Sequence, residues 1–149
     1  MWFQIWGWMK KIYHNFITKE EASLLKEISS VKLLESKNII IDKIINQLKK
    51  DFKFTIKEQS YCYTEKYPLG HEWHVDTGNN NHMSWCEVGV SILLENPTSG
   101  GDTYYADNID GDNKIRSDRK LYDLIAHTSD VYHMVESHVG SRNVFLIFI

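Results

Sequence analysis

From about residue 52 to its end, the sequence is a series of short segments rich in Val, Ile, Tyr and Phe. The stretch "FKFTIKEQSYCYTEKY" alternates between apolar and polar residues, as a half-buried strand does. Turn-forming segments such as "TGNNNH", "NPTSGG" and "DNIDGDN" separate these runs. The segment "CEVGVSILLE" places four apolar residues on one strand face, namely Val88, Val90, Ile92 and Leu94. Many short strands of this kind predict a β-sandwich or barrel.

Two helices are predicted before this region, within about residues 15–50. The segment "TKEEASLLKEISS" begins with Thr18 and Glu21 at capping-box spacing, and a helix-like apolar stripe follows. The segment "NIIIDKIINQLKKDF" has a second stripe, formed by Ile40, Ile41, Ile44, Ile45 and Leu48. Two helices followed by many strands predict an α+β fold, in which the helices cover one sheet of a β core at about residues 52–149.

Length and composition limit the number of domains and the class of partner. A chain of 149 residues, with no internal repeat and no Pro/Gly linker, predicts a single domain over residues 1–149. The net charge of -3 gives no global attraction to nucleic acid or to an anionic membrane. Cys62 and Cys86 lack the spacing of a thiolate zinc site or a disulfide framework, which favours a reducing setting.

The N-terminal stretch "MWFQIWGWMKK" is apolar and rich in tryptophan. It is too short to span a membrane, which takes roughly 20 apolar residues, and it lacks the charge pattern of a signal peptide. Its alternation predicts a strand or a packed arm, and the alternative is an interfacial or oligomer contact. We therefore expect a cytoplasmic protein with no membrane partner, and the sequence indicates no particular oligomeric state.

Residues 71–76 read "HEWHVD", and this spacing is compatible with part of a metal site. Residues i and i+2 of a strand point to the same face, so His74 and Asp76 would lie side by side. Two histidines and one carboxylate hold the metal in non-haem iron oxygenases, although a His-x-Asp pair alone is not specific. His71 and His74 form an HxxH pair, but the neighbouring proline and glycine argue against the helix that such a pair needs. We expect His71 to be exposed or to lie beside the site.

A third ligand has to come from elsewhere in the chain. The candidates are His82, His127, His133 and His138. His82 lies in an Asn-rich loop that would hold a metal poorly, and the other three lie close in sequence to Arg142, which precedes a long apolar strand. A buried arginine needs an anion, and its guanidinium matches a carboxylate through two hydrogen bonds. The alternative is an internal salt bridge to Asp or Glu.

Four segments between residue 61 and the end form an ordered set of motifs. They are "YCYTEKYPLGHEWHVD" with a tyrosine, a glycine and HxD, "VGVSILLENPTSGGDTYY" with Gly-Gly-acid-Thr, "HTSDVYHMV" with a distal histidine, and "GSR" with Gly-x-Arg. Together they resemble the Fe(II)/2-oxoglutarate-dependent oxygenases of the prolyl-4-hydroxylase-like group. The ordered set is more specific than any single segment.

The resemblance implies roles for individual residues. The iron ligands would be His74, Asp76 and His133. Arg142 would bind the distal carboxylate of 2-oxoglutarate, and Tyr63 would donate a hydrogen bond to the same carboxylate. Two alternatives to Tyr63 share its strand face, namely Tyr61 and Tyr67. Three positions would be structural, with the glycines permitting a tight turn between strands: Gly100, Gly101 and Thr103.

The resemblance also implies the fold, the cofactors and the reaction. The β core would be a double-stranded β-helix, also called a jelly-roll or cupin-like fold. The protein would be a dioxygenase that binds Fe(II) and uses 2-oxoglutarate and O2 as cosubstrates, with ascorbate as an optional reductant. It would hydroxylate a C–H bond of a protein or peptide residue such as proline, and it would release succinate and CO2.

Two alternative functions stay open. A non-catalytic jelly-roll protein could bind a metal with the same triad and would not need Arg142 buried beside it. An oxygenase could also act on a nucleobase or a small molecule. The nucleobase branch commonly has an additional arginine after the cosubstrate arginine, and none follows Arg142 here. We therefore expect a protein or peptide partner and not a nucleic acid.

The sequence departs from the family pattern in the distal-histidine motif. His127 stands where the family has phenylalanine, and Ser137 stands where it has proline. A histidine at position 127 either lies near the iron or is an ordinary packed strand residue.

Two long polar loops, residues 77–85 and 106–119, are candidates for lids over the site. Three aromatic residues are candidates for a substrate groove: Trp73, Trp85 and Tyr105. Trp85 has a core position as its alternative. A basic cluster in and after the second loop is expected to be a solvated turn and not a site for an acidic substrate. It comprises Lys114, Arg116, Arg119 and Lys120.

Overall fold

The computed structural model describes residues 2–5, 8–66, 69–78 and 81–149. In this part of the chain the elements are β1 (Trp2–Ile5), β2 (Trp8–Tyr13), α1 (Lys19–Leu25), β3 (Val31–Lys32), a 3-10 helix (Leu33–Glu35), α2 (Ile39–Leu48), β4 (Tyr61–Glu65), β5 (His71–His74), β6 (Val88–Glu95), β7 (Ser99–Gly100), β8 (Thr103–Ala106), β9 (Ile115–Arg116), β10 (Leu124–Thr128), β11 (Tyr132–Val135), β12 (His138–Val139) and β13 (Asn143–Phe148). Both α-helices precede the main run of strands, as the sequence predicts.

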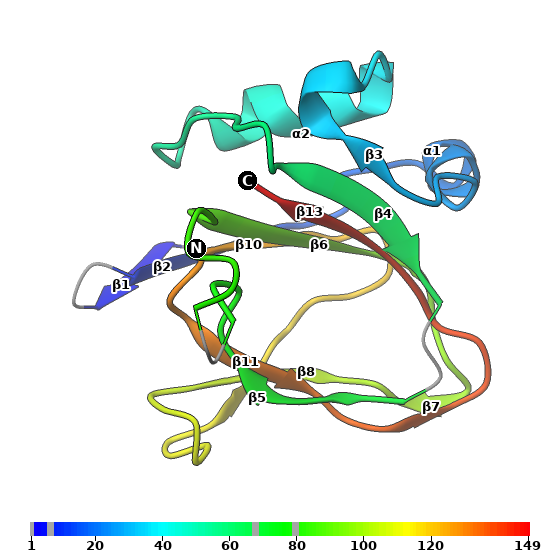
Figure 1. The fold of residues 1–149 in the computed structure, drawn as a ribbon. Helices are drawn as coiled ribbons and strands as arrows, with labels where there is room; N and C mark the ends of the chain where they lie inside the picture. The colour runs from blue at the N-terminus through cyan, green and yellow to red at the C-terminus, as the bar shows by residue number, and fades with distance from the viewer. Residues whose placement is uncertain (1, 6–7, 67–68, 79–80) are drawn as a thin grey trace.

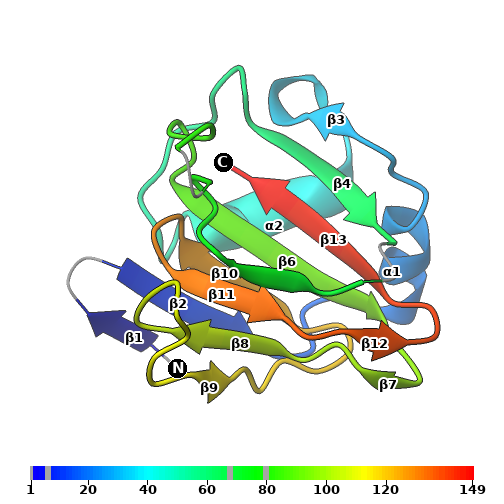
Figure 2. The same cartoon turned by 60° about the horizontal axis from the view of Figure 1, so that its bottom comes forward.

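Two antiparallel sheets face each other and form the body of the protein. The larger sheet has the order β1-β2-β10-β6-β13-β4-β3, the smaller has the order β5-β11-β8-β9, and β12 pairs separately with β7. Figures 1 and 2 show the smaller sheet lying across from the larger one, with the chain passing repeatedly between them. This arrangement is the predicted jelly-roll, or double-stranded β-helix.

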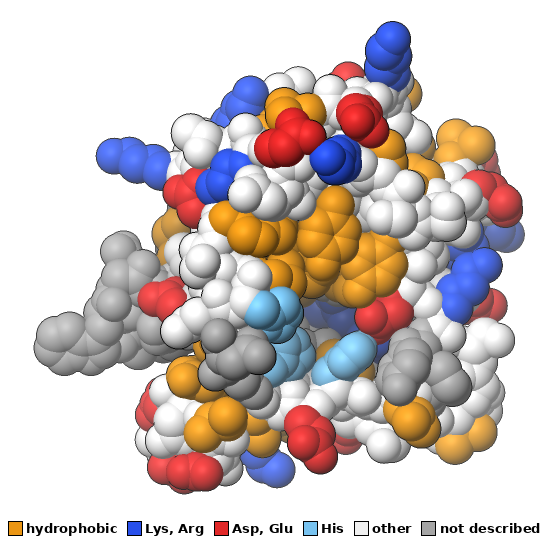
Figure 3. Space-filling model, in the orientation of Figure 1, with side chains coloured by type: hydrophobic (Ala, Val, Ile, Leu, Met, Phe, Trp, Pro, Cys, Tyr) orange, Lys and Arg blue, Asp and Glu red, His pale blue; other side chains and the backbone are white. Residues whose placement is uncertain are grey.

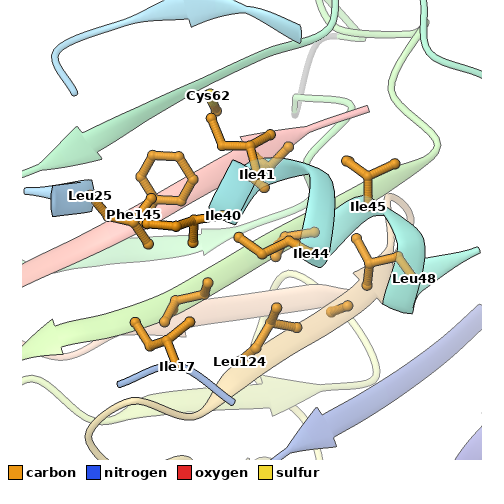
Figure 4. Close-up of a cluster of buried hydrophobic side chains, with 14 of the residues drawn as sticks. Ile17, Leu25, Ile40, Ile41, Ile44, Ile45, Leu48, Cys62, Leu124 and Phe145 are labelled. Carbon is orange, nitrogen blue, oxygen red and sulfur yellow. The ribbon is translucent and has the colours of Figure 1, made fainter. Parts of the chain in front are cut away.

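The two helices cover the outer face of the larger sheet (Figure 1). The apolar stripe of α2 packs in one buried cluster with Leu124 of β10 and Phe145 of β13 (Figure 4). The four apolar residues of β6 that share a face, Val88, Val90, Ile92 and Leu94, are buried in the same cluster, as their alternation predicts. The main apolar core therefore lies on one side of this sheet, and the other side faces the smaller sheet.

Side-chain caps define where the helices begin. The hydroxyl of Thr18 accepts a hydrogen bond from the backbone N–H of Glu21, and the carboxylate of Glu21 accepts one from the backbone N–H of Thr18, each at 3.0 Å. This is the predicted capping box. Asn38 caps α2, because its side-chain oxygen accepts a hydrogen bond from the backbone N–H of Ile40 at 2.8 Å. The caps satisfy amides that have no partner within a helix.

The N-terminal residues extend the larger sheet at one edge. β1 and β2 form a hairpin, and β2 pairs with β10, with Lys10 opposite His127. The predicted strand is therefore confirmed for the described N-terminal residues. No helix in the described part of the chain is long and apolar enough to cross a membrane.

Two isoleucines of α2 provide a matched test of this packing. Ile44 is 0% exposed and Ile39 is 81% exposed. We expect Ile44→Ala to lower the free energy of unfolding by about 2–5 kcal/mol, because it leaves a cavity in the core. The control Ile39→Ala should change it by no more than about 0.5 kcal/mol. Urea denaturation measures both values, and similar losses would mean that α2 does not pack through this face.

Candidate active site

A cavity of about 640 Å3 lies between the two sheets. The larger sheet contributes aromatic and aliphatic side chains, among them Tyr61, Leu146 and Phe148, and the smaller sheet contributes histidines. Figure 3 shows this face hollowed, with histidine side chains along the hollow, hydrophobic side chains above them and a basic side chain in its depth. Apolar walls with a few convergent polar groups are typical of small-molecule sites.

An irregularity in β5 turns both histidines of "HEWH" toward this cavity. His74 pairs with His133 of β11, whereas His71 pairs with Val135, so two residues of β5 oppose one residue of β11 between these pairs. A β-bulge of this kind shifts the alternation of side chains. His71 and His74 therefore line the same cavity, with ring centroids 6.0 Å apart. His71 lies beside the site, as expected, but through a bulge that the sequence pattern does not indicate.

His74, Asp76 and His133 come together in the cavity. One ring nitrogen of each histidine and one carboxylate oxygen lie within 4.8 Å of one another. The Nε2 atom of His133 is 3.3 Å from Oδ1 of Asp76. Two imidazole nitrogens and one carboxylate oxygen suit a divalent transition metal such as Fe(II), and three protein ligands leave further coordination positions open. The donor set therefore fits the predicted iron site.

Backbone carbonyl groups orient both histidines of this triad. Nδ1 of His74 lies 2.6 Å from the carbonyl oxygen of Glu72, and Nδ1 of His133 lies 2.9 Å from that of Val131. In each case the carbonyl is two residues earlier in the chain, and it can accept a hydrogen bond only if Nδ1 carries the proton. This tautomer leaves the lone pair on Nε2, the atom that faces Asp76 in the case of His133.

The surroundings hold two members of the triad, His74 and Asp76, in the protonation states that a metal requires. Burial would lower the pKa of the third member, His133, but the neighbouring Asp76 carboxylate outweighs it and raises this pKa. Burial, followed by the charge of neighbouring His133, lowers the pKa of His74 to about 4. Burial alone would raise the pKa of Asp76, but His133 and His127 outweigh it and hold this pKa well below its usual range. At neutral pH, His74 is therefore neutral and Asp76 is ionised, which are the forms that coordinate a metal.

His127 lies next to the triad and holds the second oxygen of Asp76. Nε2 of His127 is 2.6 Å from Oδ2 of Asp76, and Nδ1 of His127 is 3.1 Å from the hydroxyl of Tyr105. Burial raises the pKa of Tyr105, so its hydroxyl keeps its proton and donates to Nδ1, and Nε2–H of His127 donates to the carboxylate. His127 is 4% exposed. The departure from the family pattern at this position therefore places a hydrogen-bond donor on Asp76.

Gly89 makes room for the Asp76 carboxylate, and the sequence analysis missed it. Gly89 of β6 pairs with His127 of β10 and with Phe148 of β13. A Cβ atom on Gly89 would lie 1.7 Å from Oδ2 of Asp76, far inside van der Waals contact. A glycine at an inward-facing position of a central strand is the only signal that could have indicated this close approach.

Arg142 lines the same cavity and is 6% exposed. Its Nε has no hydrogen-bond partner, and within the described part of the chain no carboxylate forms an ion pair with it. Gly101 has a φ of +79°, as the predicted tight turn requires, and a Cβ there would lie 2.9 Å from Cδ of Arg142. Burial lowers the pKa of Arg142, and the charges of Glu65 and Asp102 partly offset this effect without contacting the guanidinium. A buried guanidinium that no carboxylate contacts directly is the feature expected of an anion site.

Tyr63 also lines the cavity, but its hydroxyl is bound to Glu65. It donates a hydrogen bond to Oε2 of Glu65 at 3.2 Å, and Oε1 of Glu65 lies 2.8 Å from Nε2 of His71. Tyr61 stacks against Tyr63, with ring centroids 5.9 Å apart. The third candidate, Tyr67, lies outside the described residues. The hydroxyl of Tyr63, to which the resemblance assigns a hydrogen bond with 2-oxoglutarate, is thus bonded to the Glu65 carboxylate instead.

The three aromatic residues predicted for a substrate groove lie in different environments. Trp73 packs against the turn at Gly111, where a Cβ would lie 2.7 Å from its Nε1, and it does not line the cavity. Trp85 does not line it either, but its ring lies 6.1 Å from that of Tyr61. Tyr105 lines the cavity and is 4% exposed. These positions do not form one continuous groove along the cavity wall.

Two further histidine candidates lie apart from the triad. The exposed His82 lines the cavity without belonging to the ligand cluster. His138 lies on β12, and neither ring nitrogen has a hydrogen-bond partner.

One member of the predicted basic cluster is not part of a solvated turn. Arg119 points into the cavity, where its guanidinium donates hydrogen bonds to Oγ of Ser91 at 2.5 Å and to Oγ1 of Thr103 at 3.2 Å. Arg116 is 64% exposed, as expected. The solvated-turn prediction is therefore wrong for Arg119, because the loop before β10 carries this residue back between the two sheets.

Solved structures with the same architecture include several prolyl hydroxylases. A prolyl-4-hydroxylase from Pseudomonas putida matches with a TM-score of 0.68 and 13% identity, covering 94% of this chain and 83% of that one. A viral collagen prolyl hydroxylase from Paramecium bursaria Chlorella virus-1, solved as a 2OG complex, matches with a TM-score of 0.60 and 14% identity, covering 93% of both chains. The chain has the prolyl hydroxylase fold.

A third solved structure has the same fold and contains a peptide. It is a prolyl hydroxylase from Trichoplax adhaerens in complex with a fragment of the oxygen degradation domain of hypoxia inducible factor. It matches with a TM-score of 0.58 and 14% identity, covering 93% of this chain and 82% of that one. No family model and no curated protein matches the sequence.

Gly89 offers a test of the close approach to Asp76. We expect Gly89→Ala to lower the free energy of unfolding by about 1–3 kcal/mol, because the added methyl overlaps the carboxylate. The same substitution in an Asp76→Ala background should cost much less, since the overlapping group is gone. Denaturation curves of the four proteins complete this double-mutant cycle. Equal losses in the free energy of unfolding in both backgrounds would mean that the strand packing requires Gly89, and that the Asp76 carboxylate does not.

His127 offers a test of the hydrogen bond to Asp76. We expect His127→Phe to weaken Fe(II) or Co(II) binding about 10- to 100-fold, because Asp76 loses the donor that orients it. His127→Gln keeps an N–H donor near the same position and should recover part of the affinity. Anaerobic metal titration followed by calorimetry measures the dissociation constants. Wild-type affinity in the phenylalanine variant would show that the hydrogen bond does not position the ligand.

Proposed function

We propose that this protein is an Fe(II)- and 2-oxoglutarate-dependent dioxygenase that hydroxylates a C–H bond of a protein or peptide residue such as proline. The proposal rests on one observation: a metal-binding triad and a buried arginine lie in the same cavity. The triad His74, Asp76 and His133 offers three metal-binding atoms within 4.8 Å. Arg142 presents a buried guanidinium without a carboxylate partner in the same cavity.

The side chains have separate tasks in this reaction. His74 and His133 would hold Fe(II) through Nε2, and Asp76 would hold it through a carboxylate oxygen, with His127 fixing the orientation of that carboxylate. Fe(II) held there would let O2 act as the oxidant: one oxygen atom would enter the substrate C–H bond and the other would enter succinate, as 2-oxoglutarate loses CO2. Arg142 would bind the distal carboxylate of 2-oxoglutarate.

The walls of the cavity favour such chemistry by limiting the access of water. Val144, Leu146 and Phe148 of β13 form an apolar wall on the side of the larger sheet. Charge interactions are stronger where water is excluded, which helps an arginine to select an anion. The Glu65 carboxylate bonds to His71 and Tyr63 and forms no ion pair with Arg142, although its charge acts on Arg142 and raises its pKa against the effect of burial.

A peptide substrate with an apolar target residue fits the surroundings of the cavity. Tyr61 lies against Phe148, with ring centroids 5.3 Å apart, and against Trp85. Such an aromatic group can pack against a prolyl ring through apolar contact. Three proteins of the same fold are prolyl hydroxylases, and one of them was solved with a peptide bound. Peptidyl proline is therefore the first substrate class to test.

Succinate production tests the reaction. The wild-type protein, given Fe(II), 2-oxoglutarate, O2 and ascorbate, should form succinate even without substrate, and His74→Ala should form none, because it removes a metal ligand. Arg142→Gln should raise the dissociation constant of 2-oxoglutarate about 10- to 100-fold and leave that of Fe(II) nearly unchanged. Mass spectrometry and calorimetry measure these quantities.

The outcomes separate the oxygenase from a protein that merely binds a metal. A wild-type protein that binds Fe(II) but forms no more succinate than His74→Ala would exclude the oxygenase. Equal losses of Fe(II) and 2-oxoglutarate affinity in Arg142→Gln would refute the role of this arginine. A proline-containing peptide library, screened for an added oxygen atom beside the same library with alanine in place of proline, tests the substrate class.

A further inference from the structure

We propose that Arg119 is a second arginine of the cosubstrate site, so that the distal carboxylate of 2-oxoglutarate is held between Arg119 and Arg142. The inference deepens the proposed function and rests on it. It assigns a specificity-determining role to a residue whose sequence context indicates only a solvated loop.

The position of Arg119 is fixed by both sheets. It lies between β9 and β10, and its guanidinium reaches Ser91 of β6 in the larger sheet and Thr103 of β8 in the smaller sheet. These two hydrogen bonds use two of the five N–H groups of an arginine. The side chain is thus held across the cavity with donors left for a ligand.

The two residues that anchor Arg119 lie two positions along their strands from residues that pair with, or pack against, the candidate metal ligands. On β8, Thr103 lies two residues from Tyr105, which pairs with His133. On β6, Ser91 lies two residues from Gly89, which lies against the Asp76 carboxylate. Two residues of a strand span about 7 Å. A five-carbon dicarboxylate with its 2-oxo acid end at the metal can bridge this separation and reach the arginines with its other end.

The two arginines concentrate positive charge at this end of the cavity. Both line the cavity, and both also line a smaller polar hollow of about 60 Å3 beside it. Burial, followed by the charge of Arg142, lowers the pKa of Arg119 to about 10, so both side chains stay charged at neutral pH and repel each other. An anion between them would relieve this repulsion and satisfy the unpaired Nε of Arg142.

The nearby carboxylates do not fill this role. Glu65 accepts hydrogen bonds from Tyr63 and His71, and Asp102 is 46% exposed and pairs with Arg116. Neither forms an ion pair with Arg119 or Arg142 within the described residues, although, against the effect of burial, the charges of both raise the pKa of Arg142 and that of Asp102 also raises the pKa of Arg119. Paired guanidinium groups bind a carboxylate through several charge-assisted hydrogen bonds. The site should therefore prefer a 2-oxo acid with a distal carboxylate over one without it.

The experiment compares two ligands on the Fe(II)-loaded protein without oxygen. 2-Oxoglutarate carries the distal carboxylate, and pyruvate offers the same 2-oxo acid end without it. We expect Arg119→Gln to weaken 2-oxoglutarate binding on the order of 10- to 100-fold and to leave pyruvate binding unchanged. Arg142→Gln should act in the same way, and the double variant should bind 2-oxoglutarate about as weakly as pyruvate. Charge-transfer absorption and calorimetry give the dissociation constants.

Two further variants make the result specific. Arg116→Gln removes an exposed arginine three positions away and should bind both ligands like the wild type. Arg119→Lys keeps the charge without the planar fork, so it should bind 2-oxoglutarate more tightly than Arg119→Gln but less tightly than the wild type. If Arg119→Gln does not fold, the lysine variant still tests the proposal, since its pyruvate affinity should stay unchanged.

The outcomes distinguish this inference from the proposed function. Wild-type 2-oxoglutarate affinity in Arg119→Gln, with a loss in Arg142→Gln, would mean that Arg142 acts alone. Equal losses for 2-oxoglutarate and pyruvate would overturn the inference as well, because Arg119 would then maintain the shape of the cavity and not bind the anion. Failure of the wild type to bind either 2-oxo acid would instead remove the proposed function, and the arginine pair with it.

Discussion

The carboxylate of Asp76 is a buried negative charge between two sheets, and the arrangement of the cavity around it depends on how this charge is satisfied. One oxygen faces His133, and the other accepts a hydrogen bond from His127, which Tyr105 orients in turn. Gly89 removes the side chain that would overlap the carboxylate. A buried charge is tolerated only with such partners, so these residues from four different strands act as one unit.

The outer face of the larger sheet stabilises the fold, and its inner face lines the cavity of the candidate site. The outer face packs against α2 in a large apolar cluster, which contains most of the buried hydrophobic residues in the described part of the chain. The inner face can therefore carry a histidine, a glycine and a serine without leaving the fold short of core. A single strand shows the division: β6 turns Val88, Val90 and Ile92 toward the helices and Gly89 and Ser91 toward the cavity.

The cavity itself is polarised. The candidate metal ligands, with the ionised Asp76, lie beside one row of paired strand residues. Arg119 is bonded to Ser91 and Thr103 in the next row, and Arg142 lines the same cavity. A ligand with a chelating 2-oxo acid at one end and a carboxylate at the other matches this order of charges. In the proposed reaction, this match would link the metal site to the choice of cosubstrate, because the same two sheets set the distance between both ends.

The sequence by itself determined the features that depend on local periodicity and short-range hydrogen bonds. Capping signals and apolar stripes predicted both helices, and alternation predicted the buried face of β6. The resemblance carried by the ordered motifs indicated His74, Asp76, His133 and Arg142, which line one cavity and whose roles stay predictions. Only the tertiary structure decided the bulge that turns His71 inward, the partners of His127 and Tyr63, the space at Gly89 and the return of Arg119 into the cavity. These features depend on which strands pair and in which register, and on where a loop runs after leaving a strand. Contacts between residues far apart in sequence set them, and a local pattern carries no information about such contacts.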